Sequence, residues 1–200
     1  MPINRMPKMS IKIVAGVDEV GRGPLAGPVL AAAVILPEHY CLPELNDSKK
    51  LTQAKREHLL TLIQAQASDI AIGTASVDEI DQMNILNASL LAMRRALQNL
   101  SPKPSHTQID GNRCPEFDAI NEAFVGGDSY IPNIMAASIV AKVARDKLMV
   151  EAETIYPGYG FAKHKGYPTK QHLQALQLLG ACPIHRKSFA PVKNLGGVVA

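Results

Sequence analysis

Hydrophobic and polar positions along the chain form blocks that predict strands and helices in turn. Short β-prone apolar runs predict strands at residues 11–17, 28–36, 70–77, 107–110 and 119–125. Apolar residues spaced three and four apart predict helices at residues 52–67, 84–100, 133–153 and 169–179. Two strands at the start, followed by alternating helices and strands, favour an α/β fold in which helices flank a mixed sheet that contains an early antiparallel hairpin.

The length and composition of the chain fit one globular domain. The protein has 200 residues and a mass of 21.5 kDa, with 46% hydrophobic and 20% charged residues. These values exclude a disordered, collagen-like or coiled-coil protein. We expect a single domain over residues 1–200, with an amino-terminal extension at 1–10 and a small helical lobe at about 156–200.

Positive charge is concentrated in the carboxy-terminal segment. Residues 154–200 contain six lysines and arginines and no aspartate or glutamate, although the whole chain carries a formal net charge of only +3. An unopposed basic surface of this kind suits a polyanion such as nucleic acid.

Cysteine spacing and hydropathy predict a cytoplasmic protein. The three cysteines form no C-x-x-C motif and show no zinc-finger spacing with histidine, which favours reduced thiols. The longest apolar run, residues 25–36, is interrupted by Pro28 and is shorter than the roughly 18 residues that a membrane span needs. We therefore expect no membrane segment.

Acidic residues end two of the predicted strands. Asp18 and Glu19 directly follow the first strand, and Asp110 ends the strand at 107–110. Carboxylates at the edge of a hydrophobic core are usually paired or bound to a metal, because desolvation alone costs several kcal/mol. Two simpler interpretations remain open at this point: a solvated turn after the first strand, and an Asp-Gly hairpin turn at residues 110–111.

A further carboxylate lies on the apolar stripe of the predicted helix 133–153. At about 100° per residue, Asp146 lies within about 20° of Ile139 and close to Val150. A surface ion pair with Lys142 is the alternative, but such a pair contributes only about 0.3–0.5 kcal/mol, which does not explain an acid on a buried stripe. The position of Asp146 therefore favours a functional role.

Acidic side chains from strand ends and from a helix can meet at one rim of an α/β sheet, where such folds place their active sites. Four carboxylates repel one another unless cations neutralise them, and ligation by oxygen alone suits Mg²⁺ or Mn²⁺ better than zinc. Two such ions about 3.5–4 Å apart would hold the attacking and leaving oxygens of a phosphoryl transfer. Together with the basic lobe, the acidic residues favour metal-dependent chemistry on a nucleic acid.

Six separated segments of the sequence resemble bacterial ribonuclease HII. They run from Asp18 to about residue 192 in the order expected for that family, and they read DEVGRGPLAGPV, NDSKKL, IDGN, AASIVAKVARD, HKGYPT and HRKSF. The resemblance implies a ribonuclease H-like fold and an endonuclease that cuts the RNA strand of RNA/DNA hybrids, including a single ribonucleotide within duplex DNA. The products would carry a 3′-hydroxyl and a 5′-phosphate.

By matching motif position, the resemblance implies four acidic residues that hold Mg²⁺ or Mn²⁺ and act in catalysis. These residues are Asp18, Glu19, Asp110 and Asp146. Asp128 is the weaker candidate for the fourth place, because an aspartate is ordinary in a Gly-Gly turn whereas Asp146 interrupts an apolar helix face.

Other residues match the substrate contacts of the family. The Gly21-Arg22-Gly23 element would read the 2′-hydroxyl at the cut site, a role that suits glycine because only glycine lets the backbone come so close to a ribose. Tyr167 would stack on the adjoining deoxyribose and help to recognise the RNA-to-DNA junction. Candidate phosphate contacts are Lys49, Lys50, Arg145, Lys165 and Arg186.

Other functions remain open on the sequence alone. A non-catalytic nucleic-acid-binding module would use the basic lobe and the glycine loop, whereas a metal-independent ribonuclease would use His164, His172 or His185 as acid and base. A nuclease that requires several consecutive ribonucleotides is a further alternative. We expect a monomer whose partners are RNA/DNA hybrids and ribonucleotide-containing DNA; the sequence identifies no protein partner.

Overall fold

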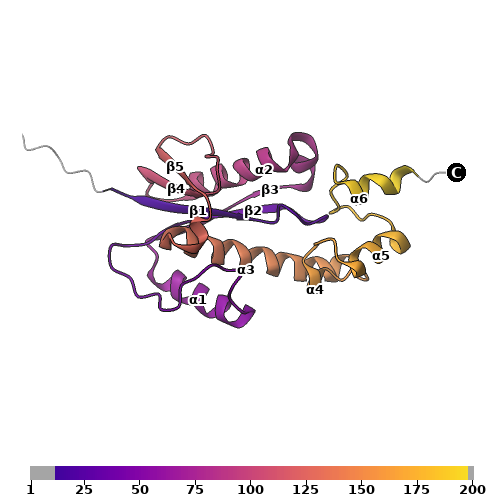
Figure 1. The fold of residues 1–200 in the computed structure, drawn as a ribbon, viewed down its shortest axis with the longest axis horizontal. Helices are drawn as coiled ribbons and strands as arrows, with labels where there is room; N and C mark the ends of the chain where they lie inside the picture. Colours follow the sequence, from indigo (N-terminus) through magenta and orange to yellow (C-terminus); the bar gives the residue numbers. More distant parts are fainter. Residues whose placement is uncertain (1–11, 198–200) are drawn as a thin grey trace, which may run out of the picture.

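A five-stranded mixed sheet forms the centre of the molecule in the computed structural model, which describes residues 12–197 (Figure 1). The strands lie in the order β3-β2-β1-β4-β5. Their bounds are β1 Val14–Val20, β2 Val29–Ile35, β3 Asp69–Ala75, β4 His106–Asp110 and β5 Ile120–Phe124. The first three strands pair antiparallel, and β4 and β5 join them in parallel. The predicted α/β fold with a mixed sheet and an early hairpin is confirmed.

Helices cover both faces of this sheet (Figure 1). Helix α2, Val77–Asn99, packs on one face, and helices α1, Gln53–Gln66, and α3, Pro132–Ile155, pack on the other. The Thr52 hydroxyl caps α1 by accepting a hydrogen bond from the Lys55 amide. The sequence prediction placed α1 and α3 within a few residues of their observed bounds.

Helix α2 begins earlier than predicted. Its start carries a capping box in which the side chains of Ser76 and Glu79 each accept a backbone N–H of the other residue. The backbone then kinks at Asn84, which has a φ of 69°, and the Asn84 side chain caps the longer second part of the helix. The sequence prediction found only this second part.

Strand β1 begins and ends three residues later than the predicted strand 11–17, so it contains the first two carboxylates. Asp18 and Glu19 pair with Ala32 and Ala31 of β2, so they lie inside the sheet and not in a turn that follows it. Because side chains alternate along a strand and Val17 packs on the α2 side, Asp18 faces the opposite side, toward α3. Asp18 is therefore buried between the sheet and α3.

Short helices form a lobe at one end of the sheet (Figure 1). The bounds of its helical elements are α4 Phe161–His164, α5 Lys170–Leu179, α6 Ala190–Lys193 and the 3-10 turn η2 Asn194–Gly197; one further 3-10 turn, η1 Gly127–Ser129, precedes α3. The lobe has its own apolar cluster around Phe161, which is fully buried and also packs against Leu25, Ala26 and Met149. This cluster joins the lobe to the end of α3 and to the loop after β1. The prediction of an extension at residues 1–10 lies outside the described residues.

None of the helices within residues 12–197 is long and apolar enough to cross a membrane.

Candidate active site

Carboxylates from three separate elements meet at the end of the sheet where β1 and β4 finish. Oxygen atoms of Asp18, Asp110 and Asp128 lie within 4.8 Å of one another. Strands β1 and β4 are parallel neighbours with Val17 opposite Ile109, so the residues that follow these two come side by side. Asp128 comes from η1, and its backbone N–H donates to Asp110 Oδ1 over 3.3 Å. The fold therefore gathers acidic groups from distant parts of the chain.

Glu19 lies next to this cluster and is incompletely bonded. Its Oε1 is 3.4 Å from the Arg22 guanidinium, whereas its Oε2 is buried and has no hydrogen-bond partner within the described part of the chain. A buried carboxylate oxygen without a partner is costly, which makes it a ready ligand for a cation. We refer to Asp18, Glu19, Asp110 and Asp128 below as the carboxylate site.

The surroundings of the carboxylate site disfavour the ionised form of its acidic groups. Burial raises the pKa of Asp18 well above its usual value, and the charges of Glu19 and Asp110 raise it further. Burial also raises the pKa of Glu19 and of Asp110. Such shifts identify groups whose charge lacks compensation from the protein itself.

Oxygen-only donors, mutual repulsion and an unpartnered buried oxygen together fit hard divalent cations of the Mg²⁺ or Mn²⁺ type. Cysteine and histidine, the preferred ligands of zinc, take no part in the cluster that the described residues form. The donor set at this site therefore agrees with the cations expected from the sequence.

The structure places Asp128, and not Asp146, beside the other acidic residues. Asp128 joins Asp18 and Asp110, whereas Asp146 pairs with Lys142 at 2.8 Å, as the alternative interpretation had it. Ser138 is the residue of α3 that acts on the pKa of Asp18, and Asp146 lies eight residues, or roughly 12 Å, further along this helix. The prediction was wrong because the buried side of α3 changes partners: its second half turns Arg145 and Met149 inward, against the lobe.

Hydroxyl groups that the sequence analysis did not single out support Asp18. The Ser138 hydroxyl is close enough to Asp18 to lower the pKa of that carboxyl, and the Ser138 and Ser48 hydroxyls lie 2.7 Å apart. Both serines are buried. A serine at 138 within the apolar run of α3 was the available signal, since a buried hydroxyl needs a polar partner.

Lys49 is the cation closest to the site among its predicted phosphate contacts. Its ammonium lies 2.7 Å from Asp128 Oδ2, although three quarters of its side chain is exposed. Lys50 is exposed, and Lys165 is half-buried, with its ammonium donating to the Ala162 carbonyl. The structure thus places Lys49 beside the carboxylates and Lys165 in the lobe.

The Gly21-Arg22-Gly23 loop lies directly after β1 and beside Tyr167. Arg22, Gly23 and Tyr167 are exposed, and the Tyr167 ring lies 3.5 Å from where a Gly23 side chain would begin. Gly21 has a φ of +97°, and a Cβ there would overlap the Arg145 side chain. The loop and the tyrosine therefore form one continuous exposed surface next to the carboxylate site.

Two of the predicted phosphate contacts are not exposed. Arg145 and Arg186 are fully buried, and their guanidinium groups donate to backbone carbonyls. Burial lowers the pKa of Arg145 to about 10 and that of Arg186 to about 9. The sequence shows that these residues are basic but not that surrounding loops enclose them, so their charge cannot contact a phosphate directly.

The histidines of the metal-independent alternative form a buried network in the lobe. Cys182 N–H donates to His185 Nδ1 over 2.9 Å, and His172 Nδ1 is 2.9 Å from the Tyr167 carbonyl. These backbone partners fix the ring tautomers, so His185 Nε2–H donates to His172 Nε2 over 3.0 Å. His164 is also buried and stacks on His172. Histidines that are buried and already bonded are unsuited to acid–base chemistry on a bound nucleic acid.

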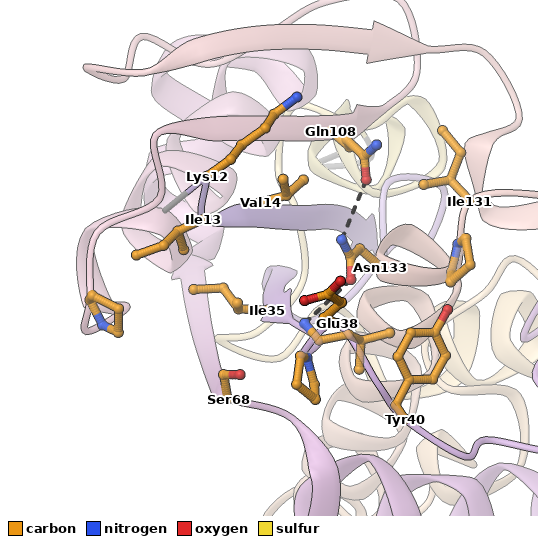
Figure 2. Close-up of a pocket in the computed structure, with 14 residues that line it drawn as sticks. Lys12, Ile13, Val14, Ile35, Glu38, Tyr40, Ser68, Gln108, Ile131 and Asn133 are labelled. Carbon is orange, nitrogen blue, oxygen red and sulfur yellow. Dashed lines mark hydrogen bonds between the residues drawn. The ribbon is translucent and has the colours of Figure 1, made fainter. Parts of the chain in front are cut away.

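A hollow at the start of β1 is separate from the carboxylate site (Figure 2). It measures about 700 Å³ and lies between Lys12, Tyr40 and Asn133. Asn133 bonds to Gln108 and to the Leu36 amide, as the dashed lines in Figure 2 show. No member of the carboxylate site lines this hollow.

Comparisons with known proteins agree with this geometry. Residues 15–192 match the family model described as Ribonuclease HII. A protein of that name from Burkholderia ambifaria is 55% identical over 183 residues, which cover 92% of this chain and 84% of the relative.

Solved structures show the same fold. Ribonuclease H2 from Pyrococcus horikoshii OT3 matches with a TM-score of 0.76 and 27% identity, over 92% of this chain and 97% of the other. The ribonuclease HII of Archaeoglobus fulgidus, solved in complex with PCNA, matches with a TM-score of 0.73 and 23% identity, over 87% and 93%. The chain therefore belongs to the ribonuclease HII family, as the six sequence segments predicted.

Proposed function

We propose that the protein is an endonuclease that hydrolyses the RNA strand of RNA/DNA hybrids and cuts on the 5′ side of single ribonucleotides embedded in duplex DNA. The products would carry a 3′-hydroxyl and a 5′-phosphate. Membership of the ribonuclease HII family supports the ribonuclease H activity. The single observation that carries the mechanism is the carboxylate cluster beside the exposed glycine loop.

Divalent cations are the cofactors in this proposal, with Mg²⁺ or Mn²⁺ held by Asp18, Glu19, Asp110 and Asp128. Two such cations, when bound with substrate, supply the charge that activates the attacking water and stabilises the departing 3′-oxygen. The protein contributes fixed oxygen ligands. Asp18 accepts a hydrogen bond from the Glu19 N–H, and Asp110 accepts one from the Asp128 N–H.

Substrate recognition falls to the exposed surface next to the carboxylates. The Gly21-Arg22-Gly23 loop can approach the ribose closely and detect its 2′-hydroxyl, the group that separates RNA from DNA. Tyr167, which lies against Gly23, is placed to stack on the next deoxyribose. Lys49, Lys50 and Lys165 are our proposed phosphate contacts, and Lys49, which pairs with Asp128, would also be next to a phosphate bound at the carboxylate site.

All four members of the carboxylate site come from one chain, which supports a monomer as the active species. A non-catalytic binder has no use for uncompensated carboxylates that would face phosphate. The substitution Asp18→Asn separates the two functions, because a binder would keep or gain affinity whereas the proposed enzyme would lose turnover and still bind hybrid.

A duplex that carries one ribonucleotide tests the proposal. We expect incision on the 5′ side of that ribonucleotide with Mg²⁺ or Mn²⁺, no incision with EDTA, and none on the matched all-DNA duplex. Analysis of the ends should show 3′-hydroxyl and 5′-phosphate. A cyclic phosphate product without metal would instead favour histidine chemistry, and cleavage only within runs of ribonucleotides would contradict the single-ribonucleotide activity. Absence of incision under every metal condition would overturn the proposal.

A further inference from the structure

The buried arginine of the lobe is bonded to the loop that faces the substrate. The Arg186 guanidinium donates to the carbonyl of Gly21 at 2.5 Å, of Arg22 at 2.9 Å and of Gly27 at 2.8 and 3.0 Å. Arg186 is fully buried, and no carboxylate pairs with it within the described residues. The hydrogen bonds of its guanidinium therefore all go to backbone carbonyls of the glycine loop.

These bonds fix the direction of two peptide groups. The peptide bonds of the loop are trans, and in a trans peptide the C=O of one residue and the N–H of the next point in opposite directions. The carbonyls of Gly21 and Arg22 point inward to Arg186, so the N–H groups of Arg22 and Gly23 point away from it. Both of these residues are exposed.

Neither of these outward N–H groups donates a hydrogen bond within residues 12–197. Two successive free N–H groups form a donor pair that suits an oxygen atom of a nucleic-acid backbone. A charge bonded to the carbonyl side of a peptide also strengthens the N–H on its other side as a donor, because hydrogen bonds in a chain polarise one another.

We propose that Arg186 is a positioning residue for ribose recognition: it turns the Arg22 and Gly23 N–H groups outward and strengthens them as donors to the substrate. The inference rests on the proposed function and concerns a residue that does not itself touch the substrate. Lysine cannot replace Arg186 in this role, since one ammonium lacks the planar fork that reaches all three carbonyls.

Arg145 supplies a matched control. It is equally buried and also bonds to backbone carbonyls, but these belong to Ala26, Pro28 and Lys165, outside the outward-facing peptides. Arg145→Lys and Arg186→Lys thus make the same chemical change in the same buried region. Only the second alters the bonds to the carbonyls of Gly21 and Arg22.

The experiment measures binding in an Asp110→Asn background, which prevents cleavage. The full-length protein is titrated with a labelled duplex that carries one ribonucleotide and with the matched all-DNA duplex, and the ratio of the two Kd values gives ribose discrimination. We expect Arg186→Lys to reduce this ratio about tenfold or abolish it, while the Kd for all-DNA duplex stays within about twofold. Arg145→Lys should keep the ratio, and thermal unfolding confirms that both variants are folded.

A ratio unchanged by Arg186→Lys, or reduced equally by both substitutions, would overturn the inference. Amide NMR gives a second readout that does not depend on a variant: the ribonucleotide duplex should shift the Arg22 and Gly23 amide resonances more than the all-DNA duplex does. Equal shifts would also contradict it. If the wild-type protein cleaves the ribonucleotide duplex but Arg186→Lys keeps normal ribose discrimination, only the inference is overturned. If the wild-type protein fails to cleave this duplex, the proposed function is overturned as well.

Discussion

The carboxylate site and the carboxy-terminal lobe both bury titratable groups, but they compensate for this burial in opposite ways. The polar groups of the lobe find their partners within the protein: its histidines bond to one another and to backbone groups, and Arg186 bonds to carbonyls of the glycine loop. The carboxylate site is incomplete, with raised pKa values and an unpartnered oxygen on Glu19. The difference supports our two proposals, that the lobe positions the backbone of the glycine loop and that the carboxylate site binds cations.

The largest effect should follow from removing a ligand of the carboxylate site. Asp110→Asn should reduce hybrid cleavage at saturating Mg²⁺ by at least about 100-fold, a loss that even outer partners of a metal can cause. Steady-state cleavage of a labelled RNA/DNA hybrid measures it. Asp118→Asn, an exposed acid that bonds to none of these residues, is the control and should retain activity. Similar rates for both variants would remove the distinction between the two regions.

In the lobe, the largest effect should be on stability. Phe161 is fully buried and packs on Tyr159 and on all three lobe histidines. Phe161→Ala should therefore lower the free energy of unfolding by about 3–5 kcal/mol. Denaturant unfolding measures the change, with the substitution of Leu178, which is 84% exposed, by alanine as a control expected to change little. A small loss from Phe161→Ala would show that the lobe core is loosely packed.

The two regions were not equally predictable from sequence. Local patterns predicted strand β2, helix α1 and the meeting of Asp18 with Asp110. The patterns are an apolar run, the Thr52 cap and acidic residues near the ends of apolar strands. The prediction for Asp146 rested on helical periodicity, which shows which side of α3 is buried but not which element packs against each half of that side. Asp128 sits in a turn whose position depends on tertiary packing. The burial of Arg145 and Arg186 was missed for a similar reason, because their hydrogen bonds to backbone carbonyls depend on loops that come together only in the folded protein.

Acid should weaken the lobe. Burial and the neighbouring His172 lower the pKa of His185 from 6.5 to about 4, so the unfolded chain takes up a proton at this residue before the folded protein does. The stability contribution is complete above pH 6.5 and is lost progressively as the pH falls from 6.5 to about 4. Thermal unfolding across this pH range should show the loss, which His185→Gln should reduce and the exposed His58→Gln should not.

The carboxylate site should respond in the other direction. Because the pKa of Asp18 is raised in the folded protein, its ionisation destabilises the fold as the pH rises above the usual value of 3.8. Asp18→Asn should therefore raise the Tm at pH 7 in EDTA, and the difference should shrink as the pH approaches 3.8. Added Mg²⁺ should stabilise the wild type more than the variant. A lower Tm for Asp18→Asn in EDTA would indicate that the site is already compensated.

Mn²⁺ binding by calorimetry, with wild type, Asp128→Asn and Asp146→Asn compared at one pH and ionic strength, tests the central claim most directly. The account predicts that Asp128→Asn weakens the affinity for Mn²⁺ at least about tenfold and that Asp146→Asn leaves it unchanged. The reason is that Asp128 lies beside Asp18 and Asp110, whereas Asp146 pairs with Lys142. Loss of Mn²⁺ binding in Asp146→Asn with normal binding in Asp128→Asn would contradict it.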